Sequence, residues 1–379
     1  MSHETVDLLQ DLIAIDSVNP SLVPGGAGEA EVAGKVAQWM GSAGLDVVTS
    51  EVAPGRPNVV GVLDGRSDGP ALLFCGHTDT VGVAGMKGPF DPVEQEGRIY
   101  GRGAEDMKGG LAAMMGAAGR LARDGVIGRG RLIVACVVDE EYGSLGAEAL
   151  VRDWTADAAV VTEPTSLVIG VGHRGFSWVE VKTEGRAAHG SRPKDGRDAI
   201  FRMGRVLARL ESLDRELQSR PAHPILGTGS LHASLIQGGR EMSTYPDEAV
   251  LLLERRTVSG EGPETALGEV EEILRQLGKE DPEFRATARR TFDRPPYVTP
   301  EDASLPESLA SVLARIGREA RRDGMSFWTD AAVLGGAGIA SVVFGPSGAG
   351  LHELVEYVRV DDVLACEEAL YQLGRELLA

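Results

Sequence analysis

The sequence predicts an α/β fold with a mixed, mostly parallel sheet and helices on both of its faces. First, short apolar runs alternate with longer stretches of helical periodicity, a pattern typical of such sheets. Second, hydrophobic residues make up 42% of the chain and charged residues 25%, which are ordinary values for a compact globular protein. Third, the chain has 379 residues. At roughly 100 to 200 residues per domain, we expect two domains or one large domain with an insertion.

The apolar runs are short enough for buried strands and the periodic stretches long enough for helices. Strands are predicted at 59–63, 71–75, 131–138, 158–162 and 341–344. Helices are predicted at 27–44, 108–123, 305–322 and 361–378.

The middle of the chain has a different pattern. It reads as a strand at 176–184, a helix at 195–219, strands at 231–237 and 249–255, a helix at 264–277 and a strand at 284–291. The order β-α-β-β-α-β is that of a ferredoxin-like α+β domain. We therefore expect an inserted domain at 174–292, and a larger domain made of residues 1–173 and 293–379.

Charge and cysteine usage restrict the partners. The net charge of −19 repels nucleic-acid phosphates and anionic membranes, so neither is an expected partner. The chain has no run of 18 apolar residues, so no membrane span is expected. Its N-terminus has no basic segment that would suggest a signal peptide. The three cysteines are widely spaced and odd in number, which favours a reducing compartment and a cytoplasmic location.

Histidine and acidic residues stand just after the predicted strands of the larger domain. They are His77 and Asp79 after 71–75, Asp139, Glu140 and Glu141 after 131–138, Glu163 after 158–162, and His352 after 341–344. Asp106, in the glycine-flanked segment GRGAEDMKGG, follows in the connection after the first of these strands. Ligands bind in the crevice at the carboxyl ends of strands in open α/β sheets, so we expect these side chains to converge.

So many carboxylates in one apolar cleft would repel each other, and their charged forms would be costly to bury. A divalent cation removes both costs. Imidazole and carboxylate ligands suit zinc, with cobalt and manganese as alternatives. These ligands could bind two ions about 3.5 to 4 Å apart, with one carboxylate bridging the two ions.

These motifs resemble, in order and spacing, those of the acetylornithine deacetylase / succinyl-diaminopimelate desuccinylase / glutamate carboxypeptidase family of co-catalytic zinc hydrolases. The resemblance covers nearly the whole chain and rests on six segments: HTD at 77–79, GRGAEDMKGG at 101–110, DEE at 139–141, TEP at 162–164, AHGS at 188–191 and LHE at 351–353.

The resemblance implies a role for each of these residues. His77 and Glu163 would hold one metal ion, Glu141 and His352 the other, and Asp106 would bridge them. Asp79 would accept the ring N–H of His77, which fixes its tautomer. Glu140 would be the general base that takes a proton from metal-activated water. The resemblance also implies a cis peptide bond at Asp106-Met107.

The resemblance further implies that the inserted domain is a lid and a dimerisation domain, although monomers occur among such proteins. His189 is similar to the family's lid histidine, which polarises the scissile carbonyl group. Arg256 is a candidate ligand for a substrate carboxylate, and Arg255 would then face the opposite side of the strand. Many relatives have an Asn shortly before a DxR sequence. This chain departs from that pattern, with Ser243 as the other candidate substrate-binding residue and Glu254 before Arg255.

Three functions are compatible with these sequence motifs. The first choice is hydrolysis of N-acyl amino acids by a metal-bound hydroxide. The second is a carboxypeptidase or dipeptidase that acts on short peptides. The third is a non-catalytic metal-binding homologue, against which the presence of Glu140 argues, because a purely structural site does not need it.

Overall fold

The computed structural model describes residues 3–379. By backbone contacts the chain divides into two compact units, and the second comprises Gly172–Val298 and Gly324–Trp328. The first unit contains the other residues, from both ends of the chain. Each unit has its own cluster of buried hydrophobic side chains.

The large sheet follows the order β1-β2-β6-β3-β7-β15-β8, continued at its edge by β13, with β14 also pairing β8. Its strands are β1 (Asp46–Ala53), β2 (Arg56–Asp64), β3 (Ala71–His77), β6 (Arg131–Val137), β7 (Ala158–Val161), β8 (Ile169–His173), β13 (Tyr297–Val298), β14 (Arg322–Met325) and β15 (Ala340–Val343). The five strands predicted for this sheet are thereby confirmed.

The sheet is mixed, but parallel pairing is confined to its centre, where β6, β3, β7 and β15 are neighbours. The pairs β1–β2, β2–β6 and β15–β8 are antiparallel. The expectation of a mostly parallel sheet therefore holds only for the central strands β6, β3, β7 and β15. The physical reason at one edge is the short connection between β1 and β2, since strands joined by a tight turn must run antiparallel.

Helices cover both faces of this sheet. They are α1 (Glu4–Ile13), α2 (Ala30–Ser42), α3 (Gly109–Asp124), α4 (Leu145–Asp153), α7 (Leu305–Arg315), α8 (Ala331–Gly336) and α9 (Val360–Leu378). Alternate strand residues such as Phe74 and Val134 share a core with α3 and α9. Their neighbours Leu73 and Ala135 are buried outside that core, as are Ala147 and Leu150 of α4. This alternation is expected of a sheet covered on both sides.

The helix predicted at 305–322 is shorter than expected. It ends at Arg315, and Gly317 then adopts a positive φ of 75°, a conformation in which glycine commonly terminates a helix. Strand β14 begins at Arg322.

A second, small sheet in the first unit has the order β16-β17-β5-β4. Its strands are β4 (Val93–Gln95), β5 (Arg98–Tyr100), β16 (Gly348–Ala349) and β17 (Tyr357–Arg359). It joins the segment before Asp106 to the segments on either side of His352. A wide, irregular helical turn, η1 (Ala104–Lys108), follows β5.

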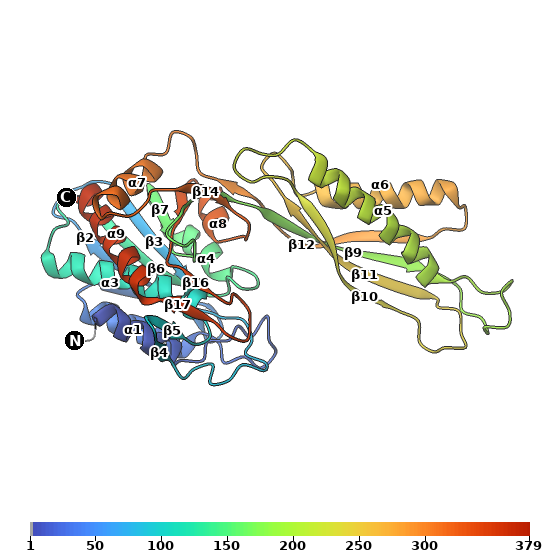
Figure 1. Ribbon diagram of the computed structural model, residues 1–379, viewed down its shortest axis with the longest axis horizontal. Coiled ribbons are helices and arrows are strands. Elements are labelled where there is room, and N and C mark those ends of the chain that lie inside the picture. Colours follow the sequence, from blue (N-terminus) through green and yellow to red (C-terminus); the bar gives the residue numbers. More distant parts are fainter. Residues whose placement is uncertain (1–2) are drawn as a thin grey trace. The chain divides into compact units, whose positions relative to one another are not determined.

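The second unit contains the predicted β-α-β-β-α-β order. Its elements are β9 (Gly175–Glu184), α5 (Ala199–Ser219), β10 (Ser230–Gly238), β11 (Glu248–Thr257), α6 (Thr265–Glu280) and β12 (Ala286–Arg294). The sheet order β10-β11-β9-β12 is antiparallel throughout, and α5 and α6 cover one face of it (Figure 1). This is the predicted ferredoxin-like α+β arrangement. Helix α5 begins at Ala199, because the carboxylate of Asp198 accepts the backbone N–H of Phe201 at 2.9 Å.

Among residues 3–379, none of the helices combines the length and the apolar character needed to cross a membrane.

Candidate metal centre

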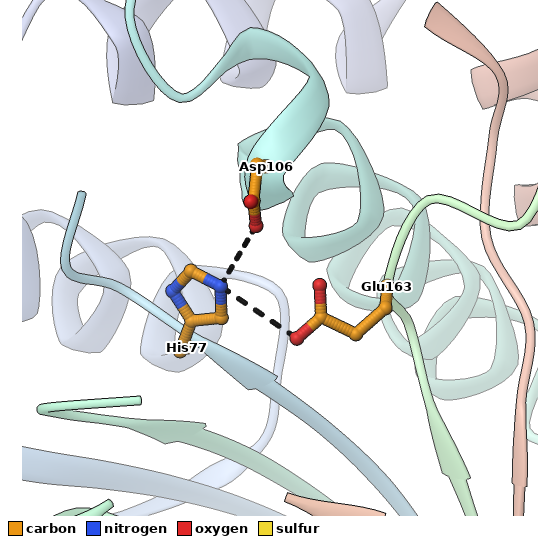
Figure 2. A group of neighbouring side chains, drawn as sticks. All are labelled: His77, Asp106 and Glu163. Atoms are coloured by element: carbon orange, nitrogen blue, oxygen red, sulfur yellow. Dashed lines mark hydrogen bonds and ion pairs between the residues drawn. The ribbon is translucent and has the colours of Figure 1, made fainter. Parts of the chain in front are cut away.

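His77, Asp106 and Glu163 form a first group of side chains, shown in Figure 2. They come from the end of β3, from η1 and from the segment that follows β7, and they point toward one another. Nε2 of His77 lies 3.1 Å from Oδ1 of Asp106 and 3.6 Å from Oε1 of Glu163. His77 and Glu163 are buried.

Asp106, Glu141 and His352 form a second group that shares its carboxylate with the first. Nε2 of His352 lies 3.4 Å from Oδ2 of Asp106 and 3.2 Å from Oε2 of Glu141. Each oxygen of Asp106 therefore faces a different histidine. The five residues predicted as metal ligands thus fall into two groups joined by Asp106, with the potential ligand atoms of each group within 4.8 Å of one another.

The electrostatics of the two groups show a large excess of negative charge. Burial, followed by repulsion from Asp106, raises the pKa of Glu141 to about 7. Burial and charge repulsion also raise the pKa of Glu163 well above its usual value. Hydrogen bonds to Asp106 and Glu141 raise the pKa of His352 to about 10. Both groups would thus be stabilised by additional positive charge.

This donor set fits divalent metal ions. Each group offers one imidazole nitrogen and two carboxylates, which are ligands typical of zinc, cobalt or manganese. Oε1 of Glu141 is buried and has no hydrogen-bond partner within residues 3–379, so it is free to bind an ion.

Glu140 lies beside the two groups but belongs to neither. Its Oε2 is 4.0 Å from Nε2 of His77. Burial, and then the charge of Glu163, raise the pKa of Glu140 well above its usual value. The carboxyl group therefore holds a proton more readily than an ordinary glutamate does.

Asp79 lies beside His77 as expected, and it makes contacts beyond the predicted one. Nδ1 of His77 is 2.9 Å from the backbone carbonyl of Asp79 and 3.5 Å from its carboxylate. The carboxylate also accepts the backbone N–H groups of Glu140 and Glu141, both at 3.1 Å. Asp79 thus orients His77 mainly through its carbonyl and fixes the adjacent acidic segment through its side chain. The Asp106-Met107 peptide bond is cis, as expected.

Asn19 and Arg56 also belong to this site, although no sequence motif predicted them. The side-chain amide of Asn19 donates to Asp79 at 2.7 Å and to Asp139 at 3.0 Å, while its oxygen accepts the backbone N–H of Ser21. Arg56 donates to Asp139 at 2.8 Å and forms a buried ion pair with Glu29. The one local signal was the Asn-Pro-Ser sequence at 19–21, which is typical of a turn in which asparagine accepts a nearby amide.

His189, Ser243 and Arg256 belong to the second unit. His189 and Ser243 lie on neighbouring segments, since the N–H of Gly190 donates to the carbonyl of Ser243 at 2.7 Å. Nδ1 of His189 accepts the backbone N–H of Ser191 at 3.2 Å. In the neutral ring the proton is then on Nε2.

Arg256 is not a free cation, because its Nε donates to Glu254 at 2.6 Å and its guanidinium lies 5.4 Å from the ring centre of Phe176. Arg255 is fully buried and bonds Glu261 and Glu269. It faces the helix-covered core, so the opposite orientation predicted for the two arginines is confirmed.

The chain is similar to known proteins over most of its length. Residues 73–376 match Peptidase family M20/M25/M40. An acetylornithine deacetylase from Myxococcus xanthus is 32% identical over 378 residues, covering 96% of this chain and 94% of that protein. An N-formyl-4-amino-5-aminomethyl-2-methylpyrimidine deformylase from Bacillus subtilis (strain 168) is 28% identical, with 86% of each protein covered.

The fold is also similar to that of an M20 family metallo-carboxypeptidase from Sulfolobus solfataricus. The TM-score is 0.81 at 17% identity, and 99% of each chain is covered. The resemblance inferred from the six sequence segments is thereby confirmed. The chain belongs to Peptidase family M20/M25/M40 and is a hydrolase of that family.

Proposed function

We propose that this protein hydrolyses the amide bond of N-acyl amino acids with the help of two divalent metal ions, of which zinc is the first choice. The observation that carries the proposal is the shared carboxylate of Asp106, which joins two histidine-carboxylate groups beside the unassigned acid Glu140. The similarity to an acetylornithine deacetylase over nearly the whole chain supports this substrate class.

His77, Asp106 and Glu163 would hold one ion, and Asp106, Glu141 and His352 the other. Bound divalent ions would supply Lewis acidity, which lowers the pKa of water from 15.7 to about 7 and stabilises negative charge on oxygen. Glu140 then takes the proton from the attacking water and delivers it to the leaving amine. Asp79 and Asn19 hold His77 and the segment 139–141 in the positions that this proton transfer requires.

The second unit would supply the substrate contacts. The Nε2–H of His189 donates a hydrogen bond to the scissile carbonyl oxygen as negative charge develops on it. Arg256, held by Glu254, binds the free carboxylate of the substrate, and Ser243 lies on the segment beside His189. Residues 174–292 would thus act as the lid of the larger domain at 1–173 and 293–379.

The same unit would also form a homodimer. Strand β10 is at the edge of its sheet, and Leu235 and Ile236 on it are 63% and 53% exposed. Phe201 of α5, the helix that packs on β10, is 76% exposed. Pairing of two β10 edges would cover these apolar side chains and the unpaired backbone groups of the strand.

We also propose a cytoplasmic location, which the three buried free cysteines support.

Release of amine from a substrate panel tests the proposed activity. The panel contains N-acetyl, N-succinyl and N-formyl amino acids and unblocked dipeptides, offered to protein loaded with zinc, cobalt or manganese and to protein treated with a chelator. We expect turnover of N-acyl amino acids that the chelator abolishes and added zinc restores. Turnover of dipeptides alone would favour the peptidase alternative, and activity that survives complete metal removal would refute the metal mechanism.

A further inference from the structure

Glu356, just before β17, is a buried carboxylate that accepts four hydrogen bonds. Its side chain is 1% exposed. Oε2 accepts Nη1 of Arg102 at 2.6 Å and the backbone N–H of Gly103 at 2.9 Å. Oε1 accepts the backbone N–H groups of Glu105 at 2.9 Å and Asp106 at 3.1 Å. One side chain therefore binds most of the segment that leads to the shared carboxylate.

This segment needs an external partner for its amides. Gly103 has a positive φ of 77°, and Asp106 and Met107 have non-helical backbone angles within η1. A backbone with this shape cannot pair its N–H groups as a regular helix or strand does, and a buried N–H without a partner is costly. Glu356 supplies acceptors for three such N–H groups, including that of Asp106 itself.

Glu356 also ties this segment to His352. The two residues belong to the same loop, which connects β16 to β17. Arg102, bound to Glu356, donates through Nη2 to the carbonyl of Glu353 at 2.8 Å. The backbone N–H of Gly101 donates to the carbonyl of Glu356 at 3.2 Å. Asp106 and His352, whose side chains are 3.4 Å apart, are thus carried by two segments joined through one carboxylate.

We propose that Glu356 is a positioning residue of the metal centre: it fixes Asp106 relative to His352 and thereby sets the affinity for the ion held with Glu141. This inference rests on the proposed metal centre. Partners of this kind, which orient metal ligands without binding the ion, typically contribute 10- to 100-fold to metal affinity.

The test is a zinc titration of the full chain and its Glu356→Gln variant by calorimetry, with bound metal counted by elemental analysis. Gln would place an NH₂ group against backbone donors and remove the charge that faces Arg102. We expect one of the two zinc ions to bind about 10- to 100-fold less tightly. Excess zinc should restore turnover, which would not follow if the variant merely unfolded.

Glu367→Gln is the matched control. Glu367 on α9 is also 1% exposed and pairs with an arginine, Arg120, at 3.1 Å, but it contacts none of the proposed metal ligands. Its variant should lose thermal stability without losing zinc affinity.

Arg102→Lys weakens the ion pair between residue 102 and Glu356. It leaves in place the hydrogen bonds that the backbone N–H groups donate to Glu356. It should lower zinc affinity in the same direction but less, and it serves as the test if Glu356→Gln does not fold. Parental zinc affinity in both variants, or an equal loss in Glu367→Gln, would overturn the inference alone. Failure of the parental protein to bind zinc would overturn the proposed centre as well.

Discussion

Glu140 and Glu141 are neighbours in sequence, yet their carboxyl groups have different surroundings. Glu141 lies 3.2 Å from His352 within a ligand group, whereas Glu140 lies outside both groups. The preceding residue, Asp139, has a positive φ of 70°, and its carboxylate is held by Asn19 and Arg56. This sharp turn separates the two identical side chains, to which the proposed mechanism assigns different tasks.

Glu140→Ala should therefore keep both metal ions and lose turnover. Loss of a general acid–base group lowers kcat by roughly 10²- to 10⁴-fold. The measurements are kcat on an N-acetyl amino acid and zinc content of the same sample. Glu141→Ala is the comparison, since it should lose zinc as well. Near-parental turnover by Glu140→Ala would remove this residue as the base.

At the scale of elements, the site depends on how closely α3 approaches the end of β7. A Cβ at Gly110, in the first turn of α3, would lie 1.9 Å from the carbonyl oxygen of Thr162. Thr162 immediately precedes Glu163, and Asp106 immediately precedes the residues that lead into α3. The missing side chain at Gly110 thus lets two ligand-bearing segments approach each other.

Gly110→Ala should destabilise the protein by about 1 to 3 kcal/mol, because the helix must move away from a backbone carbonyl. Urea unfolding of the metal-free protein measures the change. Gly34→Ala in α2 is the control, since no heavy atom lies within 4 Å of the added Cβ. That variant should be unchanged or more stable by up to about 1 kcal/mol. Equal free energies of unfolding for the two variants would contradict the packing argument.

At the scale of the whole molecule, association must overcome a charge of −19 on each copy. Repulsion of this kind is screened by salt, with a Debye length of about 8 Å at physiological ionic strength. A dimer formed through β10 therefore requires the apolar contacts of Leu235, Ile236 and Phe201, and salt should strengthen it.

Ile236→Lys should convert the dimer to a monomer, because a charge on an edge strand opposes pairing with a second edge. Light scattering after size-exclusion chromatography gives the mass directly. Val48→Lys on β1, an edge strand of the large sheet whose Val48 side chain is 44% exposed, is the matched control and should leave the mass unchanged. A parental protein with the mass of one chain would refute the proposed dimer.

Local patterns were sufficient for the strands that end at the metal centre and for the inserted β-α-β-β-α-β order. Strand 71–75 followed by His77 is one example, since a buried apolar run and the polar residue after it are both local features. His77, Glu141 and Glu163 could be grouped for the same reason, because the carboxyl ends of neighbouring parallel strands meet at one edge of a sheet. Asp106 and His352 lie instead in η1 and in the loop between β16 and β17.

The turn between β1 and β2 and Gly317 at the end of α7 are local features, but the antiparallel pairing of β15 with β8 and the contacts of Asp79 were decided by tertiary structure. So were the roles of Asn19, Arg56 and Glu356, whose partners are distant in the sequence and are often backbone amides. The sequence by itself determined the family, and the residue types of the candidate metal centre and their order. It could not determine which buried acceptor satisfies an irregular loop such as η1, because that depends on which distant segment passes beside it, and hydrogen bonds of this kind leave no periodic pattern in the chain.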